Sequence, residues 1–562
     1  MKILIIGGVA GGASAAARLR RLDEKAEITV LEQGEFVSFA NCGLPYYIGG
    51  DIADRDALLL QTPGSFKARF GIDVRVFSEA IHIDRAGKTV AVRDLKTGKE
   101  YSEAYDKLIL SPGAKPFIPP VPGIDNSKVF TVRNIPDTLK IKEYINSGAP
   151  ASAVVVGGGY IGIEMAENLK QAGLEVTIVE MADHVIASLD YDMACLVHNY
   201  IKKKGIGLLP GTRLSSIEDE SGKLSLTLEP MAQTAPLHGG GDALCPAKQS
   251  ADMVILSVGI RPDTNLAKAA GLELGATGAI KVDSTMRTSD ENIYAVGDAV
   301  EIPEFVTGRP SNIPLAGPAN KQGRIAADNI CGFESKYKGT QGSAIIKVFD
   351  MTVAVTGITE AAAANQGIDY DKVFTLSASN ASYYPGGREM AVKTIFEKTT
   401  GRILGAQIVG YKGADKRIDV LAAAIRAGMT ATDLTELELC YAPPFSSAKD
   451  PINFAGYVIE NTVTGLVKNF HWHDVGSLPR DGSVTLLDVR TPGEYKAGCI
   501  EGFINIELDS LRENLGRLDA AKPVYVHCRS GLRSYLACRI LKQNGFDCFS
   551  LSGGYWFYSS IV

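Results

Sequence analysis

The strongest constraint on the fold is a run of strand, glycine turn and helix that occurs twice in the chain. In the first copy the apolar residues 2–6 enter the turn 7–12 (GGVAGG), and an alanine-rich helix is expected over 13–22. The strand that follows ends on Glu32. Amides at the start of such a helix cradle a pyrophosphate, and an acid at the end of the next strand accepts a hydrogen bond from a ribose. Val9 stands where the pattern usually has its middle glycine.

The second copy matches the pattern in full and begins about 150 residues after the first. The apolar residues 154–156 enter the turn 157–162 (GGGYIG), and the following strand ends on Glu180. Two copies in the same structural context indicate two dinucleotides, one held permanently and one exchanging. The residues predicted to contact them are Gly7, Gly12 and Glu32 in the first copy and Gly157, Gly159, Gly162 and Glu180 in the second.

Glu180 also bears on the choice of nicotinamide cofactor. A carboxylate at this place accepts a hydrogen bond from the 2′-hydroxyl of NADH and repels the 2′-phosphate of NADPH. The three residues that follow it include no arginine that would bind the extra phosphate. The sequence therefore predicts NADH rather than NADPH.

Length and composition narrow the class of protein. A chain of 562 residues is expected to form about four domains. The net charge of −6 gives no broad basic field, so a nucleic acid partner is not expected. No apolar run approaches the ~18 residues of a membrane span, and residues 1–7 read as a buried strand rather than a signal peptide. Nine cysteines at scattered spacings indicate a reducing, cytoplasmic setting without a disulfide framework.

Further motifs resemble those of the pyridine nucleotide-disulfide oxidoreductases over residues 1 to about 460. Residues 288–298 (TSDENIYAVGD) are similar to the second flavin fingerprint of that family, which implies that Asp298 binds the ribityl chain of FAD. The resemblance implies an α/β chain with FAD and NAD Rossmann-like domains and an α+β domain that forms a homodimer. The expected boundaries are 1–115 with 255–330 for FAD, 116–254 for NAD(P)H and 331–460 for dimerisation.

Cys42 lies in the segment 38–43 (SFANCG), which resembles the single-cysteine branch of the family. This branch contains the coenzyme A-disulfide reductases, NADH oxidases and NADH peroxidases. The dithiol branch has a second cysteine where this chain has Tyr47, and the peroxidases have a histidine where it has Ala10. A lone cysteine beside a flavin needs a small external partner, and amides at a helix start together with the flavin are expected to favour its thiolate.

Two tyrosine motifs indicate the coenzyme A-disulfide reductases within this branch. Residues 382–386 (SYYPG) and 439–444 (LCYAPP) place Tyr383 and Tyr441 where those enzymes use tyrosines of the partner subunit, and residues 413–420 (GADKRIDV) are also similar. The resemblance makes both tyrosines candidate proton donors to a departing sulfur. By the same resemblance the candidate contacts for coenzyme A are Ser14, Arg18, Arg21, Ser38, Asn41, Asn320 and Lys449.

The C-terminal residues 470–562 resemble the α/β rhodanese domain. Residues 486–490 (LLDVR) lead towards the loop 528–534 (CRSGLRS), in which four residues separate Cys528 from Arg533. That loop length is the one found in rhodaneses, and its amides are expected to form an anion nest around a Cys528 persulfide, with Arg533 as its cation. Ser534 is expected to cap the helix that follows.

Together these features predict NADH-driven, FAD-dependent reduction of coenzyme A disulfide, coenzyme A persulfide or polysulfide through Cys42, with Cys528 handling sulfane sulfur. The combination resembles coenzyme A-disulfide reductases fused to rhodanese, also described as persulfide or polysulfide reductases. Two alternatives stay open, an NADH oxidase that cycles Cys42 through sulfenic acid and a non-catalytic redox sensor. No metal site is predicted, since His471 and His473 are read as strand-surface residues, and residues 229–250 are read as a mobile insertion without an assigned role.

Overall fold

The computed structural model describes residues 1–231 and 247–562, and these form two compact units. The first unit contains residues 1–183, 205–231 and 247–342, and the second contains 184–204 and 343–562. Each unit is described by itself below. The core of the expected insertion, residues 232–246, lies outside the described residues, whereas its ends belong to strands.

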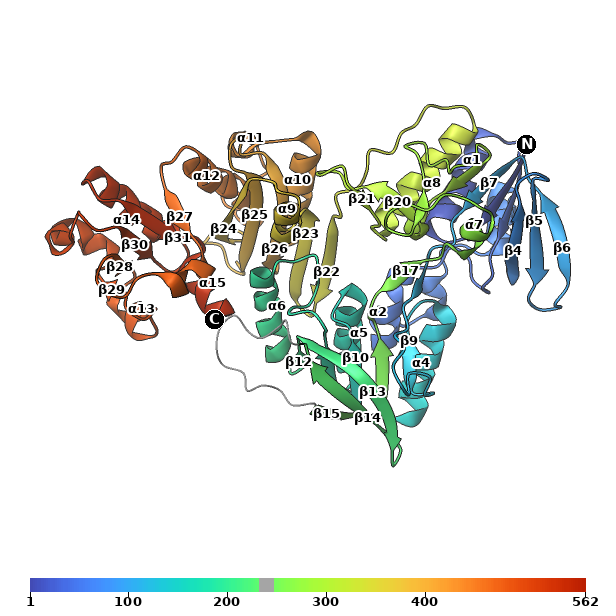
Figure 1. Ribbon diagram of the computed structural model, residues 1–562, viewed down its shortest axis with the longest axis horizontal. Coiled ribbons are helices and arrows are strands. Elements are labelled where there is room, and N and C mark those ends of the chain that lie inside the picture. Colours follow the sequence, from blue (N-terminus) through green and yellow to red (C-terminus); the bar gives the residue numbers. More distant parts are fainter. Residues whose placement is uncertain (232–246) are drawn as a thin grey trace. The chain divides into compact units, whose positions relative to one another are not determined.

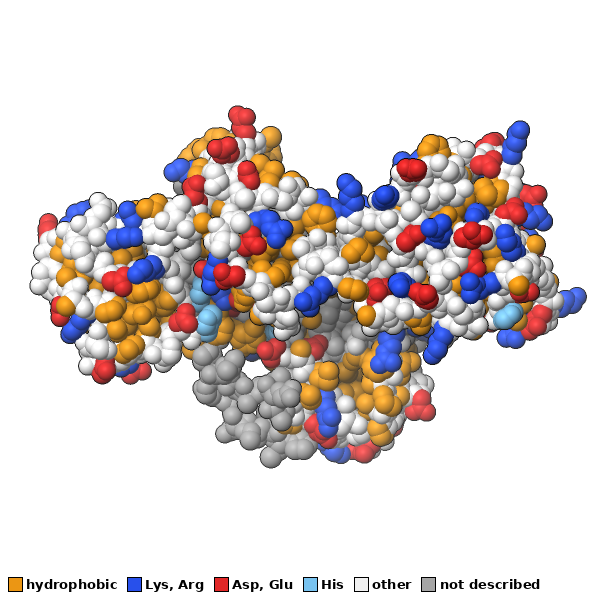
Figure 2. All heavy atoms as spheres, turned by 45° about the horizontal axis from the view of Figure 1, so that its top comes forward, with side chains coloured by type: hydrophobic (Ala, Val, Ile, Leu, Met, Phe, Trp, Pro, Cys, Tyr) orange, Lys and Arg blue, Asp and Glu red, His pale blue; other side chains and the backbone are white. Residues whose placement is uncertain are grey.

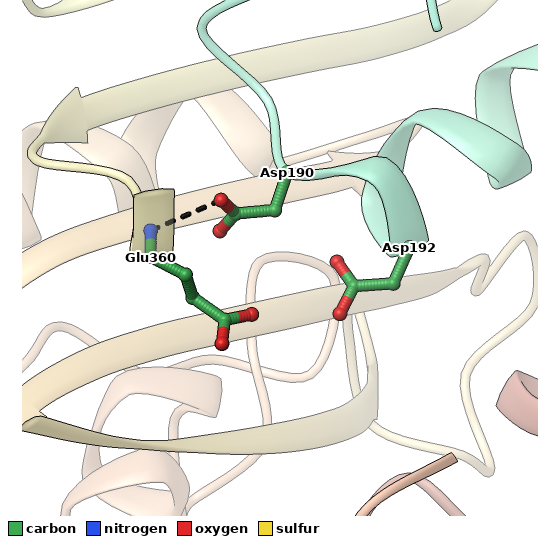
Figure 3. A group of neighbouring side chains, drawn as sticks. All are labelled: Asp190, Asp192 and Glu360. Carbon is green, nitrogen blue, oxygen red and sulfur yellow. Dashed lines mark hydrogen bonds between the residues drawn. The ribbon is translucent and has the colours of Figure 1, made fainter. Parts of the chain in front are cut away.

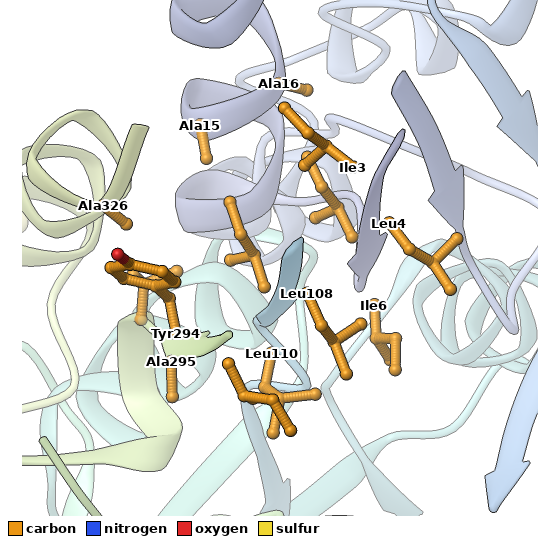
Figure 4. Packing of buried hydrophobic residues seen from close by; sticks show 14 of the residues in the cluster. Ile3, Leu4, Ile6, Ala15, Ala16, Leu108, Leu110, Tyr294, Ala295 and Ala326 are labelled. Atoms are coloured by element: carbon orange, nitrogen blue, oxygen red, sulfur yellow. The ribbon is translucent and has the colours of Figure 1, made fainter. Parts of the chain in front are cut away.

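A parallel five-stranded sheet carries the first glycine turn. Its strand order is β19-β7-β1-β2-β3, and the strands β19, β7, β1 and β2 are mainly apolar and largely buried, whereas the edge strand β3 is partly exposed. Alanines of the two helices against it allow close packing: Ala15 and Ala16 of α1 and Ala326 of α8 meet Ile3 and Leu108 in the core drawn in Figure 4. The bounds are β1 (Lys2–Ile6), β2 (Glu27–Leu31), β3 (Asp73–Arg75), β7 (Lys107–Leu110), β19 (Ile293–Ala295), α1 (Ala10–Leu22) and α8 (Ala316–Ile330).

A second parallel sheet carries the second glycine turn, in the order β12-β11-β10-β16-β9. An antiparallel sheet β13-β14-β15 precedes β16, the last strand of this parallel sheet in the sequence. The expected insertion begins at the end of β14, where residues 229–230 pair with β13, and it ends in β15, which pairs with residues 224–228. The bounds are β9 (Val129–Thr131), β10 (Ser152–Val156), β11 (Glu175–Val179), β12 (Gly207–Leu209), β13 (Thr212–Glu220), β14 (Lys223–Pro230), β15 (Ala247–Ala251), β16 (Met253–Leu256), α4 (Ile135–Gly148) and α5 (Tyr160–Gln171).

Short elements complete the first unit and connect its two parallel sheets (Figure 1). They are the strands β4 (Ser78–Asp84), β5 (Thr89–Asp94), β6 (Glu100–Ala104), β8 (Ala114–Pro116), β17 (Ile260–Pro262), β18 (Ile280–Lys281), β20 (Val300–Pro303) and β21 (Pro310–Ser311), and the helices α2 (Leu44–Gly49), α3 (Pro63–Phe70) and α7 (Asn265–Ala269).

The second unit begins with an antiparallel sheet of order β22-β23-β26-β25-β24. Helices α10 and α12 pack on this sheet, and α6 contacts its strand β26. The bounds are α6 (Tyr191–Lys203), β22 (Ala344–Val348), β23 (Met351–Gly357), α9 (Glu360–Asn365), β24 (Tyr370–Ala378), β25 (Glu389–Glu397), β26 (Ile403–Gly410), α10 (Ala414–Ala427), α11 (Ala431–Glu436) and α12 (Pro451–Val463).

The C-terminal module of this unit is a parallel sheet of order β27-β31-β30-β28-β29 with helices around it. It rests on the edge strand β24, where the Phe374 amide donates to Ser552 (3.2 Å) and the Phe374 and Phe557 rings lie 4.0 Å apart. The bounds are β27 (Lys468–Phe470), β28 (Thr485–Asp488), α13 (Pro492–Lys496), β29 (Ile504–Asn505), β30 (Val524–His527), α14 (Leu532–Gln543), β31 (Cys548–Leu551) and α15 (Gly554–Ile561).

Three local predictions were wrong. Helix α1 starts at Ala10, inside the glycine turn, rather than at residue 13. Helix α14 starts at Leu532 with Gly531 as its cap, so Ser534 lies in the first turn and its hydroxyl donates to the Gly531 carbonyl. His471 and His473 lie at a 3₁₀ turn, where His471 caps the turn and its ring faces Asp371 at 3.4 Å.

The predicted fold class is confirmed, because two Rossmann-like sheets, an α+β domain and a C-terminal α/β module are all present. None of the helices in the described part of the chain combines the length and the apolar character of a bilayer-spanning segment. On the face drawn in Figure 2 acidic and basic side chains alternate, which agrees with the small net charge.

Candidate functional site

Backbone geometry explains which glycines of the first turn are required. Gly7 has a φ of +95°, and a Cβ there would lie 2.0 Å from the Ser111 carbonyl oxygen. A Cβ on Gly12 would lie 1.9 Å from the Gly7 carbonyl oxygen. Val9 has a φ of −99°, which any residue adopts, so a valine is tolerated at the usual middle glycine. The departure from the usual motif therefore leaves the turn intact.

The second turn repeats this arrangement. Gly157 has a φ of +105°, and a Cβ on Gly162 would lie 1.9 Å from the Gly157 carbonyl oxygen. Gly159 has no atom within 4 Å of an added Cβ, which leaves open space at the start of α5. The Glu180 carboxylate accepts from the amides of Gly158 (2.5 Å) and Ala182 (2.7 Å), which holds it at the end of the strand. This geometry fits a ribose beside the turn.

The first turn has the matching acid. The Glu32 carboxylate accepts from the amides of Gly8 (3.0 Å) and Gly34 (2.9 Å). Asp298 lies just beyond β19, and burial raises the pKa of its carboxyl despite Arg133 nearby. Two buried polar atoms, the Oδ1 of Asn41 and the Oγ of Ser257, have no hydrogen-bond partner within the described residues. Ser257 adjoins Gly157 of the second turn, where a bound dinucleotide would offer its hydroxyl a partner.

Cys42 lies in a short 3₁₀ turn (Asn41–Gly43) that runs directly into α2. Burial raises the pKa of its thiol, and the charges of Glu164 and Asp298 raise it further. The expected thiolate is therefore not supplied by the protein groups alone. The thiolate expected at Cys42 from the sequence stays a prediction.

Glu164, at the start of α5, is a residue that sequence reasoning missed. Burial raises the pKa of its carboxyl to about 7, although Tyr46 lies within hydrogen-bonding reach (3.4 Å) and opposes the shift. The carboxyl therefore changes its charge near neutral pH, close enough to Cys42 to influence the thiol. Its position two residues after the second glycine turn, on the helix that contacts α2, was the available signal.

A pocket of about 380 Å³ lies between α1 and α8 and collects four of the predicted coenzyme A contacts, Ser14, Arg18, Arg21 and Ser38, together with Asn320. The Ser14 hydroxyl donates to the Asn320 side chain at 2.8 Å, which joins the two helices. The remaining lining residues are Ala13, Ala17, Gln61, Phe66, Phe70 and Arg324. Five of the seven contacts predicted from sequence thus share one cavity.

The arginines of α1 have different environments. Arg18 pairs with Asp328 at 2.7 Å, and Arg20 is buried with its guanidinium bonded to backbone carbonyls, including that of Phe70. Arg21 and Arg324 line the pocket without an ion pair among the described residues. Arg324 was missed, although it lies one helical turn after Asn320 and so faces the same side of α8. These two guanidiniums are the cations best placed for a phosphate.

The other two predicted contacts lie elsewhere. Asn41 is next to Cys42 and does not line the pocket. Lys449 belongs to the second unit, in the exposed loop before α12. Neither prediction is tested by this arrangement.

Tyr383 and Tyr441, 58 residues apart, meet in the second unit with their hydroxyl oxygens 2.9 Å apart. This hydrogen bond raises the pKa of Tyr441, so its phenol stays protonated at neutral pH. Both rings are exposed. Arg417, from the motif 413–420, is fully buried below them and bonds to Asp450 (2.9 Å) and to the carbonyl of Phe445, which fixes the loop that carries Tyr441.

Cys528 lies buried at the end of β30, where the loop turns into α14. Its sulfur accepts from the Gly531 amide at 3.1 Å and lies 3.5 Å from the Ser534 hydroxyl. Gly531 has a φ of +104°, which lets this amide turn towards the sulfur. The loop therefore directs one amide at the sulfur, whereas the nest of amides expected from residues 529–533 stays a prediction.

Arg533 does not point an unpaired charge into this loop. Its guanidinium forms two hydrogen bonds, 2.7 and 2.6 Å, to the carboxylate of Glu494 at the start of α13. The same pairing lowers the pKa of Glu494 to about 2. The positive charge of Arg533 is therefore paired with the Glu494 carboxylate rather than free to face the Cys528 sulfur.

Asp190, Asp192 and Glu360 form a group of carboxylates that resembles a metal centre at first sight (Figure 3). The ammonium of Lys393, fully buried, lies between them, 2.9 Å from Asp190 and 2.8 Å from Asp192, and also bonds to Glu360. An ammonium has three donors and here meets three acids. Lys393 thus takes the place that a cation would need, and the group is a buried ion network.

Comparison with known families agrees with this architecture. The family model described as pyridine nucleotide-disulphide oxidoreductase matches residues 1–323, and the model of its dimerisation domain matches 343–451. The model described as rhodanese-like domain matches residues 472–558.

Curated relatives cover about four-fifths of the chain. A coenzyme A disulfide reductase of Staphylococcus epidermidis is 37% identical over 462 residues, which is 81% of this chain and 99% of that protein. An NAD(P)H coenzyme A polysulfide/persulfide reductase of Pyrococcus horikoshii is 37% identical over 452 residues, 80% of this chain and 96% of that protein. A Methanocaldococcus jannaschii protein named NADH oxidase is 36% identical over 456 residues, 81% and 98% respectively.

Two solved structures extend over the C-terminal module as well. Reduced Bacillus anthracis CoADR-RHD superposes with a TM-score of 0.95 and 46% identity, covering 100% of this chain and 98% of that one. An NAD-dependent persulfide reductase from A. fulgidus gives a TM-score of 0.90 and 40% identity, covering 99% and 100%. The order of domains is therefore the same in all three chains.

Proposed function

This chain belongs to the pyridine nucleotide-disulphide oxidoreductase family, and from that premise we propose that it reduces coenzyme A disulfide, coenzyme A persulfide or polysulfide with electrons from NADH. The observation that carries the proposal is the combination of a lone cysteine, Cys42, with a pocket that contains arginines without an ion pair among the described residues and whose lining includes Ser38 of the same segment. The rhodanese-like module adds a second sulfur-handling cysteine, Cys528.

The pocket holds the nucleotide end of coenzyme A and leaves the pantetheine arm to reach Cys42. Arg21 and Arg324 bind phosphate oxygens, while Ser14 and Asn320 offer uncharged donors and acceptors. The arm then places a disulfide or persulfide sulfur beside the Cys42 thiolate. Binding energy gained far from the reacting sulfur in this way orients the substrate for attack.

Cys42 is the nucleophile. Its thiolate attacks one sulfur of coenzyme A disulfide, a Cys42–sulfur bond forms, the original sulfur–sulfur bond breaks, and one coenzyme A thiolate leaves. Tyr383 or Tyr441, contributed by the partner subunit of a homodimer, donates the proton to this leaving thiolate. Their hydroxyls are hydrogen-bonded to each other, which holds the two phenols together at one place.

The residues around the two glycine turns fit FAD at Gly7, Gly12, Glu32 and Asp298 and NADH at Gly157, Gly159, Gly162 and Glu180. When bound, FAD supplies the two-electron transfer that links NADH oxidation to cleavage of the Cys42 mixed disulfide. The sum is coenzyme A disulfide, NADH and one proton giving two coenzyme A thiols and NAD⁺. With a persulfide the products are one thiol, hydrogen sulfide and NAD⁺.

The C-terminal module transfers sulfane sulfur. The Cys528 thiolate takes the outer sulfur of a donor and becomes a persulfide inside the loop closed by the Gly531 amide. A coenzyme A thiol accepts that sulfur and carries it to Cys42 on the flexible pantetheine arm. A carrier is needed because Cys528 is itself buried at the base of its loop.

We expect a kcat/KM at least about tenfold larger with NADH than with NADPH. The Glu180 carboxylate is fixed by two amides and cannot turn away from the 2′-phosphate of NADPH. Initial rates with both nucleotides under saturating coenzyme A disulfide measure this ratio. Equal values, or a larger value with NADPH, would contradict the assignment, and Glu180→Ala should narrow the difference.

Substitution of the two pocket cations tests the substrate class. We expect Arg21→Gln and Arg324→Gln each to raise the KM for coenzyme A disulfide about tenfold, since each removes a charge-assisted hydrogen bond to phosphate. Pantethine, the disulfide of the arm without its nucleotide, is the control substrate, and its kcat/KM should be the same in the variants as in the wild type. An unchanged KM for coenzyme A disulfide in both variants would refute the phosphate role of this pocket.

One relative is named NADH oxidase, so oxygen is the alternative electron acceptor to test for this chain. An oxidase needs no nucleotide pocket at Ser14, Arg21 and Asn320 and no phenol pair beside its cysteine. Oxygen consumption in the absence of a sulfur substrate measures that activity. A value of kcat with oxygen that exceeds the value with coenzyme A disulfide would assign the protein to the oxidases.

A further inference from the structure

The loop that holds Cys528 carries two arginines, and each of them is bound by a carboxylate. Arg533 forms its two hydrogen bonds to Glu494 within the same module. Arg529, the residue directly after Cys528, forms two hydrogen bonds, 2.9 and 2.8 Å, to the carboxylate of Glu389. The loop is therefore surrounded by two positive and two negative groups.

Glu389 does not belong to the rhodanese-like module. It is the first residue of β25 in the dimerisation domain, directly after the exposed segment that contains Tyr383. The module is held against that domain by the Phe374–Phe557 contact and by the hydrogen bond from the Phe374 amide to Ser552. This packing lies within one unit and keeps Glu389 opposite the Cys528 loop.

Arg529 lies directly after Cys528 in the chain, and its pair with Glu389 is partly exposed to solvent. The Trp556 amide donates to the Arg529 carbonyl and the Tyr555 amide to the Cys528 carbonyl, so the backbone of the loop is fixed from below. The side chains of Arg529 and Glu389 are 47% and 46% exposed and face solvent. An exposed pair is weak enough for a ligand to compete with it, and while the pair is formed Glu389 offsets the positive charge that Arg529 would otherwise present to an incoming anion.

The net charge of the sulfur donor determines how strongly the pairing of Arg529 with Glu389 affects the reaction. Thiosulfate and other dianionic sulfane donors need cations near the cysteine, because a dianion meets the Cys528 thiolate with twice the repulsion of a monoanion. A thiol persulfide has a single negative charge at its reacting end. The backbone amides of the loop and the paired arginines suffice for such a group.

We propose that Glu389 sets the donor selectivity of the sulfurtransferase site, by neutralising Arg529 and so favouring thiol persulfides over dianionic donors such as thiosulfate. This inference rests on the sulfurtransferase role proposed above for Cys528. It assigns to the dimerisation domain a specificity residue for a reaction that takes place in another domain.

Both half-reactions balance without a further reagent. With thiosulfate, the Cys528 thiolate attacks the outer sulfur, the bond to the sulfonate sulfur breaks, and sulfite leaves with the electron pair. With a persulfide the leaving group is a thiolate. Cyanide then takes the terminal sulfur from the Cys528 persulfide, giving thiocyanate and restoring the thiolate.

The test measures thiocyanate formed by the full-length protein from thiosulfate, a dianion, and from 2-hydroxyethyl persulfide, whose single charge is on the persulfide sulfur. Glu389→Gln should raise the ratio of kcat/KM for thiosulfate to kcat/KM for the persulfide about fivefold at low ionic strength, with a smaller rise at high salt. Glu389→Asp, which keeps the charge but loses the two-bond geometry, should give an intermediate ratio. Glu100→Gln is the matched control, because it breaks a similar exposed pair with Arg93 in the first unit.

If Glu389 acts by neutralising Arg529, its substitution has no effect on donor selectivity once Arg529 is also removed. The ratio in the double variant Glu389→Gln/Arg529→Gln should therefore return to the wild-type value or fall below it. An unchanged ratio in Glu389→Gln, an increase that persists in the double variant, or an increase that high salt does not diminish would overturn the inference while leaving the proposed function intact. Failure of the wild type to form Cys528-dependent thiocyanate from either donor would refute both.

Discussion

Cys42→Ser is expected to retain FAD and to lose NADH-driven reduction of coenzyme A disulfide by at least about a thousandfold. A serine hydroxyl is nearly isosteric with the thiol, so the turn at 41–43 and helix α2 should fold as before. Serine cannot form a disulfide with the substrate sulfur, and no other cysteine lies within five residues of position 42 in the sequence. The flavin absorbance of the purified variant and its anaerobic rate of NADH oxidation measure the two parts of the expectation.

Cys499→Ser is the control for this variant, since Cys499 is also exposed and has no role in the scheme. Its rate should equal that of the wild type. Turnover of the Cys42→Ser variant within tenfold of the wild type would show that electrons reach the substrate without this thiol. The nucleophile would then have to be sought elsewhere in the chain.

Lys393→Met is expected to lower the free energy of unfolding of the second unit by about 3–5 kcal/mol. The substitution leaves Asp190, Asp192 and Glu360 buried together without the ammonium that bonds to all of them. Both tryptophans of the chain, Trp472 and Trp556, lie in the C-terminal module, and the Trp472 ring nitrogen donates to Asp192 at 3.3 Å. Tryptophan fluorescence during urea unfolding therefore reports on this region.

The pH dependence of the same network has a defined sign. Burial opposes ionisation of Glu360, but Lys393 and Lys372 outweigh it and hold the pKa of Glu360 at about 2. A depressed pKa contributes stability above the unfolded value of about 4.5, and this contribution disappears as the pH falls towards 2. In Lys393→Met the acids lose their counter-charge, so the deficit relative to wild type should shrink as the pH is lowered.

Lys398→Met is the matched control for the network, because Lys398 pairs with Asp369 at 3.5 Å on the surface of the same unit. Its effect should stay within about 0.5 kcal/mol. A Lys393→Met protein as stable as the wild type would show that the three acids are not charged together. Added divalent cations that raised the stability of the wild type would show that a metal displaces the lysine.

The glycine turns could be predicted from the sequence because their geometry depends on neighbours in the chain. Gly7 and Gly12 are required by the path of the backbone itself, and the valine at position 9 is tolerated for the same local reason. The alternation of strand, turn and helix then defines the parallel sheets. The Ser534 prediction failed because the φ of +104° at Gly531 lets the helix begin earlier than a serine cap would.

Residues that act across elements were harder to predict. Arg324 and Arg21 come together only because α1 and α8 pack on each other, and Glu164 reaches the surroundings of Cys42 only because α5 contacts α2. The pairing of Arg529 with Glu389 joins residues 140 positions apart in two domains. No spacing in the sequence indicates such contacts, whereas the tyrosine motifs were found because the resemblance already placed them.

The most direct test of the central claim is NADH consumption by the purified protein in the absence of oxygen, with coenzyme A disulfide, coenzyme A persulfide or polysulfide supplied in turn. The account predicts multiple turnovers that require Cys42, and a loss in Cys528→Ser that is confined to persulfide and polysulfide. Multiple turnovers would also exclude a non-catalytic redox sensor. No turnover with any sulfur substrate, followed by rapid NADH oxidation once air is admitted, would contradict the account.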